Sequence, residues 1–137
     1  MTKGRRDPAT PRPRDDCDAM LSLLLIDHGS RRAEANRQIE AVAARMALLR
    51  PQALIEVAHL DCAEPTIAQG IAALIARGAT TIQALPYFLS AGRHTQEDIP
   101  ALCQAAVASH PGVTVTVAPP LGPDDALVEL LLRRAGL

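Results

Sequence analysis

Short apolar runs alternate with longer segments of helical periodicity along most of this chain, and this alternation constrains the fold more than any other feature. The apolar runs cover 21–27, 53–60, 80–85 and 113–117. Runs of this length, rich in Val, Ile, Leu and Thr, predict buried strands. Because a helical segment follows each run, we expect an α/β fold, with a mainly parallel four-stranded sheet in a three-layer α/β/α domain.

Turn and capping residues give the expected limits of the helices. Ser30 is predicted to cap the first helix, and Pro65 is placed in the first turn of the second, where a missing N–H costs little. Gly78 is expected to end that helix. Pro100 lies near the start of the third helix, and Asp124 is predicted to cap the last. The first helix is predicted to carry an apolar face of Ile39, Val42, Met46 and Leu49.

The chain divides into a tail and one domain. Residues 1–19 are rich in Arg and Pro and contain little that a core can bury, so a disordered tail is expected there. Either a solvated tail or a translation start before Met20 fits this composition, and an acidic partner for its arginines is a third interpretation. Residues 20–137 are predicted to form a single domain.

Composition argues against several classes of function. Aromatic residues make up 1% of the chain and the net charge is −1, so neither base stacking nor a basic field favours a nucleic-acid partner. No apolar run reaches the length of a membrane span. The three cysteines form no CxxC pair, which is typical of a reducing compartment, and we expect a cytoplasmic protein.

The distinctive residues cluster just after the predicted strands. His28, Glu64, the loop 86–94 and the segment 119–122 each follow one. In a parallel α/β sheet, ligands bind beyond the carboxyl ends of the strands. The sequence therefore predicts a binding site built from these four segments at one edge of the sheet.

Two histidines in these segments are candidates for metal handling. His28 is followed by a glycine, and His94 ends a loop of small residues after a different strand. Imidazoles from separate loops can meet over one point and leave coordination positions open for a substrate. The alternatives remain a His28 that only caps its turn and a solvent-exposed His94.

Polar neighbours of the histidines suggest an acidic substrate. Arg31 and Arg93 carry guanidinium groups, which pair bidentately with carboxylates. Ser30 marks a helix start, where free N–H groups bind anions. Glu64 is a candidate proton acceptor or ligand, although a Glu at a helix start also complements the helix dipole. His59 is interpreted as a buried structural residue.

Five segments in this order resemble the small class II chelatases, the family of sirohydrochlorin ferrochelatase and cobaltochelatase. They are DHGSR at 27–31, AHLDCAEPTI at 58–67, PYFLSAGRH at 86–94, EDIP at 97–100 and APPLG at 118–122. The set extends over nearly all of the chain after the tail. Asp61 and Cys62 depart from the Glu-Leu pair expected in the second segment.

The resemblance implies a chelatase-like fold and insertion of Fe²⁺, Co²⁺ or Ni²⁺ into a sirohydrochlorin-type tetrapyrrole, in siroheme or cobalamin biosynthesis. His28 and His94 match the metal-site histidines, and His28, with Glu64, is implied in catalysis as proton acceptor. The substrate-contacting positions implied are Glu64, Leu89, Ser90, Ala91, Gly92, Arg93 and His94, to which the polar neighbours add Ser30 and Arg31. The metal is a substrate, no cofactor is implied to be permanently bound, and a homodimer is expected.

Two alternatives to catalysis differ in whether they require these residues. A metal or tetrapyrrole carrier would bind one equivalent of ligand without accelerating insertion. A purely structural partner of a larger chelatase would have no need of His28, His94 and Glu64.

Overall fold

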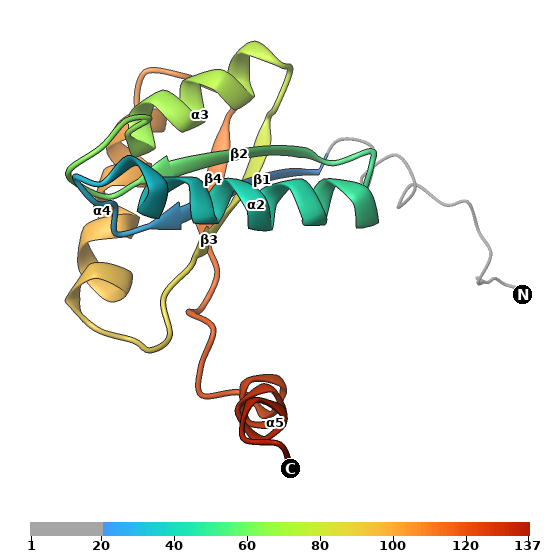
Figure 1. Ribbon diagram of the computed structural model, residues 1–137. Coiled ribbons are helices and arrows are strands. Elements are labelled where there is room, and N and C mark those ends of the chain that lie inside the picture. The colour runs from blue at the N-terminus through green and yellow to red at the C-terminus, as the bar shows by residue number, and fades with distance from the viewer. Residues whose placement is uncertain (1–20) are drawn as a thin grey trace, which may run out of the picture.

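The computed structural model describes residues 21–137, so the predicted tail over 1–19 lies outside the described residues. Its strands and helices alternate along the chain (Figure 1). The elements are β1 (Ser22–Asp27), α2 (Ala33–Leu49), β2 (Leu54–His59), α3 (Ile67–Ala76), β3 (Thr81–Pro86), the π-helical turn η1 (His94–Asp98), α4 (Ile99–Val107), β4 (Thr114–Val117) and α5 (Asp125–Arg134).

The four strands form one parallel sheet in the order β2-β1-β3-β4. The predicted α/β fold is therefore confirmed. β1 is central: Leu25 pairs with Val57 of β2 on one side and with Leu85 of β3 on the other. The strand order reverses between β1 and β3, which makes the carboxyl ends of these two strands the place where a ligand is expected.

The main core lies between the sheet and the helices α3 and α4. It is aliphatic, and its buried side chains include Leu24, Ile26, Ile71, Ile82 and Ile99. Gly70 lets α3 approach the sheet closely, since a Cβ at this position would lie 2.7 Å from Leu24 Cδ1. The absence of a side chain at Gly70 thus sets the distance between α3 and β1.

The opposite face of the sheet is covered less completely. α2 packs on β1 and β2 and buries Ile39, but Leu49, predicted on its apolar face, is 72% exposed, so that part of the prediction is wrong. β3 and β4 turn polar side chains to this side, and Thr116 Oγ1 donates to Gln83 Oε1 over 2.6 Å. The second helical layer therefore covers only half of the sheet among the described residues.

Two details of the predicted helix starts are wrong. Pro65 lies before α3 rather than in its first turn, and Thr66, which follows it, caps the helix in a capping box with Gln69. Ser30 lies before the cap of α2, which is Arg32, and its hydroxyl accepts from the Arg32 N–H over 3.0 Å. Asp124 caps α5 as predicted, accepting from Ala126 N over 2.8 Å.

Cys62 and Cys103 are free thiols in the described part of the chain. Cys103 lies in the core, and its burial raises the pKa of the thiol to about 11, so it stays neutral at physiological pH. Cys62 is exposed. Within residues 21–137, we find no helix with the length and apolar character needed to cross a membrane.

The aliphatic core predicts a large difference between two leucine substitutions. Leu24→Ala empties a fully buried site and is expected to lower the free energy of unfolding by about 2–5 kcal/mol. Leu48→Ala removes a side chain that is 82% exposed and should change it by less than about 0.5 kcal/mol. Urea unfolding followed by circular dichroism measures both, and equal midpoints would contradict this account of the core.

Candidate functional site

His28 and His94 meet at the carboxyl edge of the sheet. His28 follows β1, and His94 opens η1 at the end of the loop that follows β3. The centroids of the two rings lie 5.1 Å apart, and the ring planes make an angle of 67°. The edge-to-face pair is therefore assembled from segments more than sixty residues apart in the sequence.

Both rings border an open cavity of about 370 Å³. Its other lining residues come from the end of β2, from η1 and from α4, and they are Leu60, Asp61, Asp98, Ala101 and Leu102. Apolar walls with two carboxylates and two imidazoles suit a ligand that is partly apolar and partly polar.

Backbone pairing beyond the strand ends fixes the position of His28. Asp61 N donates to the His28 carbonyl over 2.9 Å, and Leu60 N donates to the Asp27 carbonyl over 2.8 Å. Gly29 has φ +92°, and a Cβ there would collide with the Asp61 carbonyl oxygen. The turn after β1 therefore requires glycine, both for its backbone angle and for this close approach.

A side-chain contact between His59 and Asp27 ties the same two strands together. His59 Nδ1 lies 2.6 Å from Asp27 Oδ1, and His59 is 1% exposed. The interpretation of His59 as a buried residue is therefore correct, and its contact is with the residue that directly precedes His28.

The position of His94 depends on the π-helical turn. Ile99 N donates to the His94 carbonyl and closes the wide turn. Buried Thr95 holds the preceding loop, because its hydroxyl accepts from Gly92 N over 3.0 Å and lies 3.2 Å from the Gly92 carbonyl. Phe88 packs near the His94 ring, at 6.3 Å between centroids.

Each imidazole has an acceptor at its Nδ1 atom. His28 Nδ1 donates to the Gly29 carbonyl over 3.2 Å, and His94 Nδ1 lies 2.9 Å from Asp98 Oδ2. Because carbonyl and carboxylate oxygens accept, each neutral ring carries its proton at Nδ1 and keeps its lone pair at Nε2. Nε2 of each imidazole therefore has a lone pair with which it can bind a transition metal.

The remaining predicted site residues are distributed around this point. Glu64 is exposed before α3 and does not line the cavity, where Asp61 supplies a carboxylate instead. Ser30 is held by Asn36, which accepts from Ser30 N and donates to the Ser30 carbonyl, each over 2.8 Å. Four other predicted residues lie exposed in the loops that carry the histidines: Arg31, Ala91, Gly92 and Arg93.

Leu89 and Ser90 belong to a different surface. They line a groove of about 430 Å³ together with α5 and the segment before it. The loop between β3 and η1 thus contributes to two neighbouring hollows, with His94 in one and Leu89 in the other.

Asp61, Thr95 and Asp98 contribute to the site but were not predicted from the sequence. Asp98 follows His94 by four residues, the spacing of neighbours on a helix face. The segment up to Thr95 is predicted as a loop, so the helical spacing of His94 and Asp98 is not apparent from the sequence. In the described part of the chain there is no cluster of three or more His, Cys, Asp or Glu side chains arranged to hold a metal ion.

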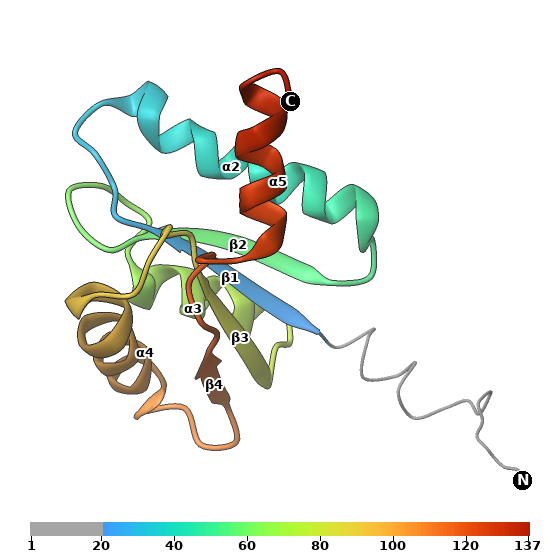
Figure 2. The ribbon, with the colours of Figure 1, turned by 90° about the horizontal axis from the view of Figure 1, so that it is seen from below.

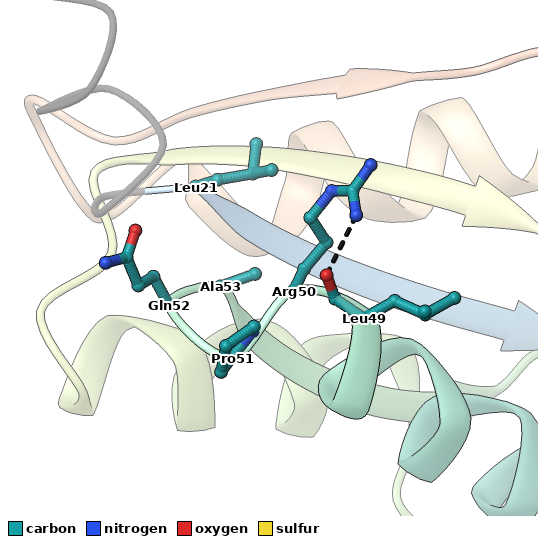
Figure 3. Close-up of a pocket in the computed structure, with 6 residues that line it drawn as sticks. All are labelled: Leu21, Leu49, Arg50, Pro51, Gln52 and Ala53. Carbon is teal, nitrogen blue, oxygen red and sulfur yellow. Dashed lines mark hydrogen bonds between the residues drawn. The ribbon is translucent and has the colours of Figure 1, made fainter.

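A smaller cavity lies at the other end of the sheet (Figure 3). It measures about 160 Å³ and is lined by Leu21 and residues 49–53. The Arg50 guanidinium donates to the Leu49 carbonyl over 2.8 Å. Because ligands of parallel sheets bind at the carboxyl ends of the strands, the histidine cavity is the better candidate for a functional site.

Comparison with known proteins identifies the family of this chain. The chain is 32% identical over 112 residues to the chloroplastic sirohydrochlorin ferrochelatase of Arabidopsis thaliana, covering 82% of this chain and 50% of that protein. It is 30% identical over 123 residues to the sirohydrochlorin cobaltochelatase of Methanococcoides burtonii, covering 84% of this chain and 94% of that protein.

The solved structure of SirB from Bacillus subtilis with Fe³⁺ is similar, with a TM-score of 0.77 and 28% identity over 83% of this chain and 45% of SirB. The chain thus spans about half the length of the Arabidopsis ferrochelatase and of SirB, and nearly all of the cobaltochelatase. The family model CbiX matches residues 22–136, almost the whole of the described chain. The chain belongs to the CbiX family.

Proposed function

We propose that this chain inserts a divalent metal ion into a sirohydrochlorin-type tetrapyrrole. The observation that carries the proposal is the pairing of His28 and His94, 5.1 Å apart at the open edge of the sheet, with Nδ1 of each ring engaged as a donor. Relatives are named sirohydrochlorin ferrochelatases and cobaltochelatases, and SirB has been solved with Fe³⁺ and with cobalt.

The metal is a substrate that the two imidazoles hold and release. Two Nε2 ligands leave positions open on a first-row ion for the ring nitrogens. Fe²⁺, Co²⁺ and Ni²⁺ all accept imidazole, so the proposed reaction takes any of them, in siroheme or cobalamin biosynthesis. No resident cofactor is needed, since insertion changes no oxidation state.

Insertion exchanges protons for the metal ion. The ring loses two N–H protons as the ion binds four nitrogens, so a base must stand near the ring centre. We assign that role to Nε2 of His28, whose lone pair becomes available as the metal ion passes from the imidazoles to the ring nitrogens and which accepts the two protons one after the other. Exposed Glu64, on the neighbouring loop, is proposed to pass the protons to solvent.

The tetrapyrrole is expected to lie over the loops that carry the two histidines. Arg31 and Arg93 are exposed beside them and suit the carboxylates of the substrate. Ser30, Leu89, Ser90, Ala91 and Gly92 are proposed to contact the ring and its side groups. The two copies of a cytoplasmic homodimer are proposed to carry out this reaction.

Removing either imidazole tests the proposal. His28→Ala and His94→Ala are each expected to lower the rate of Co²⁺ insertion into sirohydrochlorin by at least about 100-fold, because each loses a metal ligand or a base. Absorbance of the metallated ring measures the rate under anaerobic conditions. His110→Ala changes a histidine in the turn before β4 and serves as the matched control.

Rates for both variants that equal the wild-type rate would overturn the proposal. Stoichiometric binding of metal or tetrapyrrole without acceleration over the uncatalysed reaction would show a carrier instead.

The contact between Asp98 and His94 generates a second prediction. Asp98→Ala removes the acceptor that orients the His94 ring and should weaken Co²⁺ binding by about 10–100-fold. Asp98→Asn keeps an acceptor oxygen and should recover most of the affinity. Glu97→Ala removes an equal charge from the same turn and should have little effect. Titration of the cobalt d–d bands measures the affinity, and equal losses in the Asp98→Ala and Glu97→Ala variants would exclude an orienting role.

A further inference from the structure

Two polar side chains meet at the carboxyl ends of β1 and β2 and do not line the cavity of the histidines. Asp27 and His59 are register partners on these neighbouring strands, which lie side by side in Figures 1 and 2. His59 Nδ1 lies 2.6 Å from Asp27 Oδ1. The side chains are 1% exposed for His59 and 19% exposed for Asp27, so the contact is largely shielded from solvent.

The contact has a defined direction. A carboxylate oxygen accepts, so His59 Nδ1 carries the proton and donates it to Asp27 whether the imidazole is neutral or charged. A hydrogen bond to an ionised group is shorter and stronger than one between neutral groups. The contact therefore adds a side-chain tie between β1 and β2 to the backbone pairing of the two strands.

The turn that carries His28 packs directly on His59. Asp27 immediately precedes His28, and the Asp27 carbonyl accepts from Leu60 N over 2.8 Å. A Cβ at Gly29 would lie 2.9 Å from His59 Cβ, so the turn is in close contact with the end of β2 on its other side as well. The position of this turn is thus set by its contacts with β2 and the residues that follow β2.

His59 also holds the loop that follows β2. Its N–H donates to the Pro65 carbonyl over 2.8 Å, and it forms a parallel bridge with Thr66. This loop includes Asp61, which lines the histidine cavity, and Glu64, the proposed proton relay. One buried residue therefore connects the turn of His28, through its side chain, with this loop, through its backbone.

We infer that Asp27 and His59 are positioning residues for the histidine pair. The Gly29 carbonyl orients the His28 ring within its turn, whereas the contact between Asp27 and His59 places the turn itself. The inference rests on the proposed function in treating the imidazoles of His28 and His94 as one metal-binding point. Neither Asp27 nor His59 is assigned a contact with the metal ion or the tetrapyrrole.

Substitutions that break the contact test the inference. Asp27→Ala removes the acceptor, and His59→Phe keeps an aromatic ring of similar volume without a donor. Each is expected to weaken Co²⁺ binding and to slow Co²⁺ insertion by about 10–100-fold, because a small displacement of a ligating or reacting group is costly. The volume retained by His59→Phe makes it the deciding variant if Asp27→Ala does not fold.

A matched control comes from β3 and β4. Gln83 and Thr116 are register partners there, and their side chains also make a contact of 2.6 Å. Gln83→Ala breaks this contact away from the histidines and should leave the affinity and the insertion rate unchanged.

A rescue variant separates positioning from a general loss of stability. His59→Asn keeps an N–H donor the same number of bonds from Cα as Nδ1, but its side chain is smaller. It should recover most of the Co²⁺ affinity even though its urea midpoint falls. In a His28→Ala background, Asp27→Ala should cause no further loss of affinity, because its effect passes through His28. Affinities that only follow the free energy of unfolding, or losses that add in the double variant, would contradict the inference.

Nuclear Overhauser effects between the ring protons of His28 and His94 provide a readout that needs neither metal nor tetrapyrrole. The ring centroids lie 5.1 Å apart, so these effects are expected in the wild type. They should persist in Gln83→Ala and His59→Asn and be lost in Asp27→Ala and His59→Phe. Equal intensities in all of these proteins would overturn the inference.

These measurements separate the inference from the proposed function. If the ring contacts depend on Asp27 and His59 but the wild type inserts no metal, the proposed function fails and the positioning role stands. If the wild type inserts metal at a rate that neither Asp27→Ala nor His59→Phe changes, the proposed function stands and the positioning role is wrong.

Discussion

The pairing of β1 with both of its neighbours is the constraint on which the rest of the structure depends. β1 is buried on both faces and lies between β2 and β3, with Ile26 opposite Ala58 on one side and Pro86 on the other. This register brings the carboxyl ends of β1 and β3 side by side. The segments that follow them, with His28 and His94, therefore open onto one cavity.

Local hydrogen bonds orient the two imidazoles that this register brings close together. The Gly29 carbonyl and the Asp98 carboxylate accept from the Nδ1 atoms of the two rings. Both acceptors lie close in sequence to the histidine they orient, so each imidazole is oriented from within its own segment. These local contacts explain how two exposed side chains keep defined ring orientations.

The same topology leaves one face of the sheet only partly covered by the described helices. α3 and α4 cover one side of the sheet with an aliphatic core, but α2 covers only β1 and β2 on the other, among the described helices. α5 lies away from the sheet and carries its leucines outward. The described chain thus leaves these leucines open to solvent beside the loop that leads to His94.

The four strands, the parallel α/β class and the edge at which the histidines lie could be predicted from the sequence, because buried strands and helical periodicity are local patterns. The Asp124 cap of α5 was predicted in the same way. Which carboxylates stand beside the histidines depends instead on long-range packing. Asp61 and Asp98 line the cavity and Glu64 does not, since the π-helical turn and the pairing beyond the end of β2 have no clear local signature. The exposure of Leu49 and of α5 was likewise decided by packing, because an apolar stripe predicts a buried face without saying what buries it.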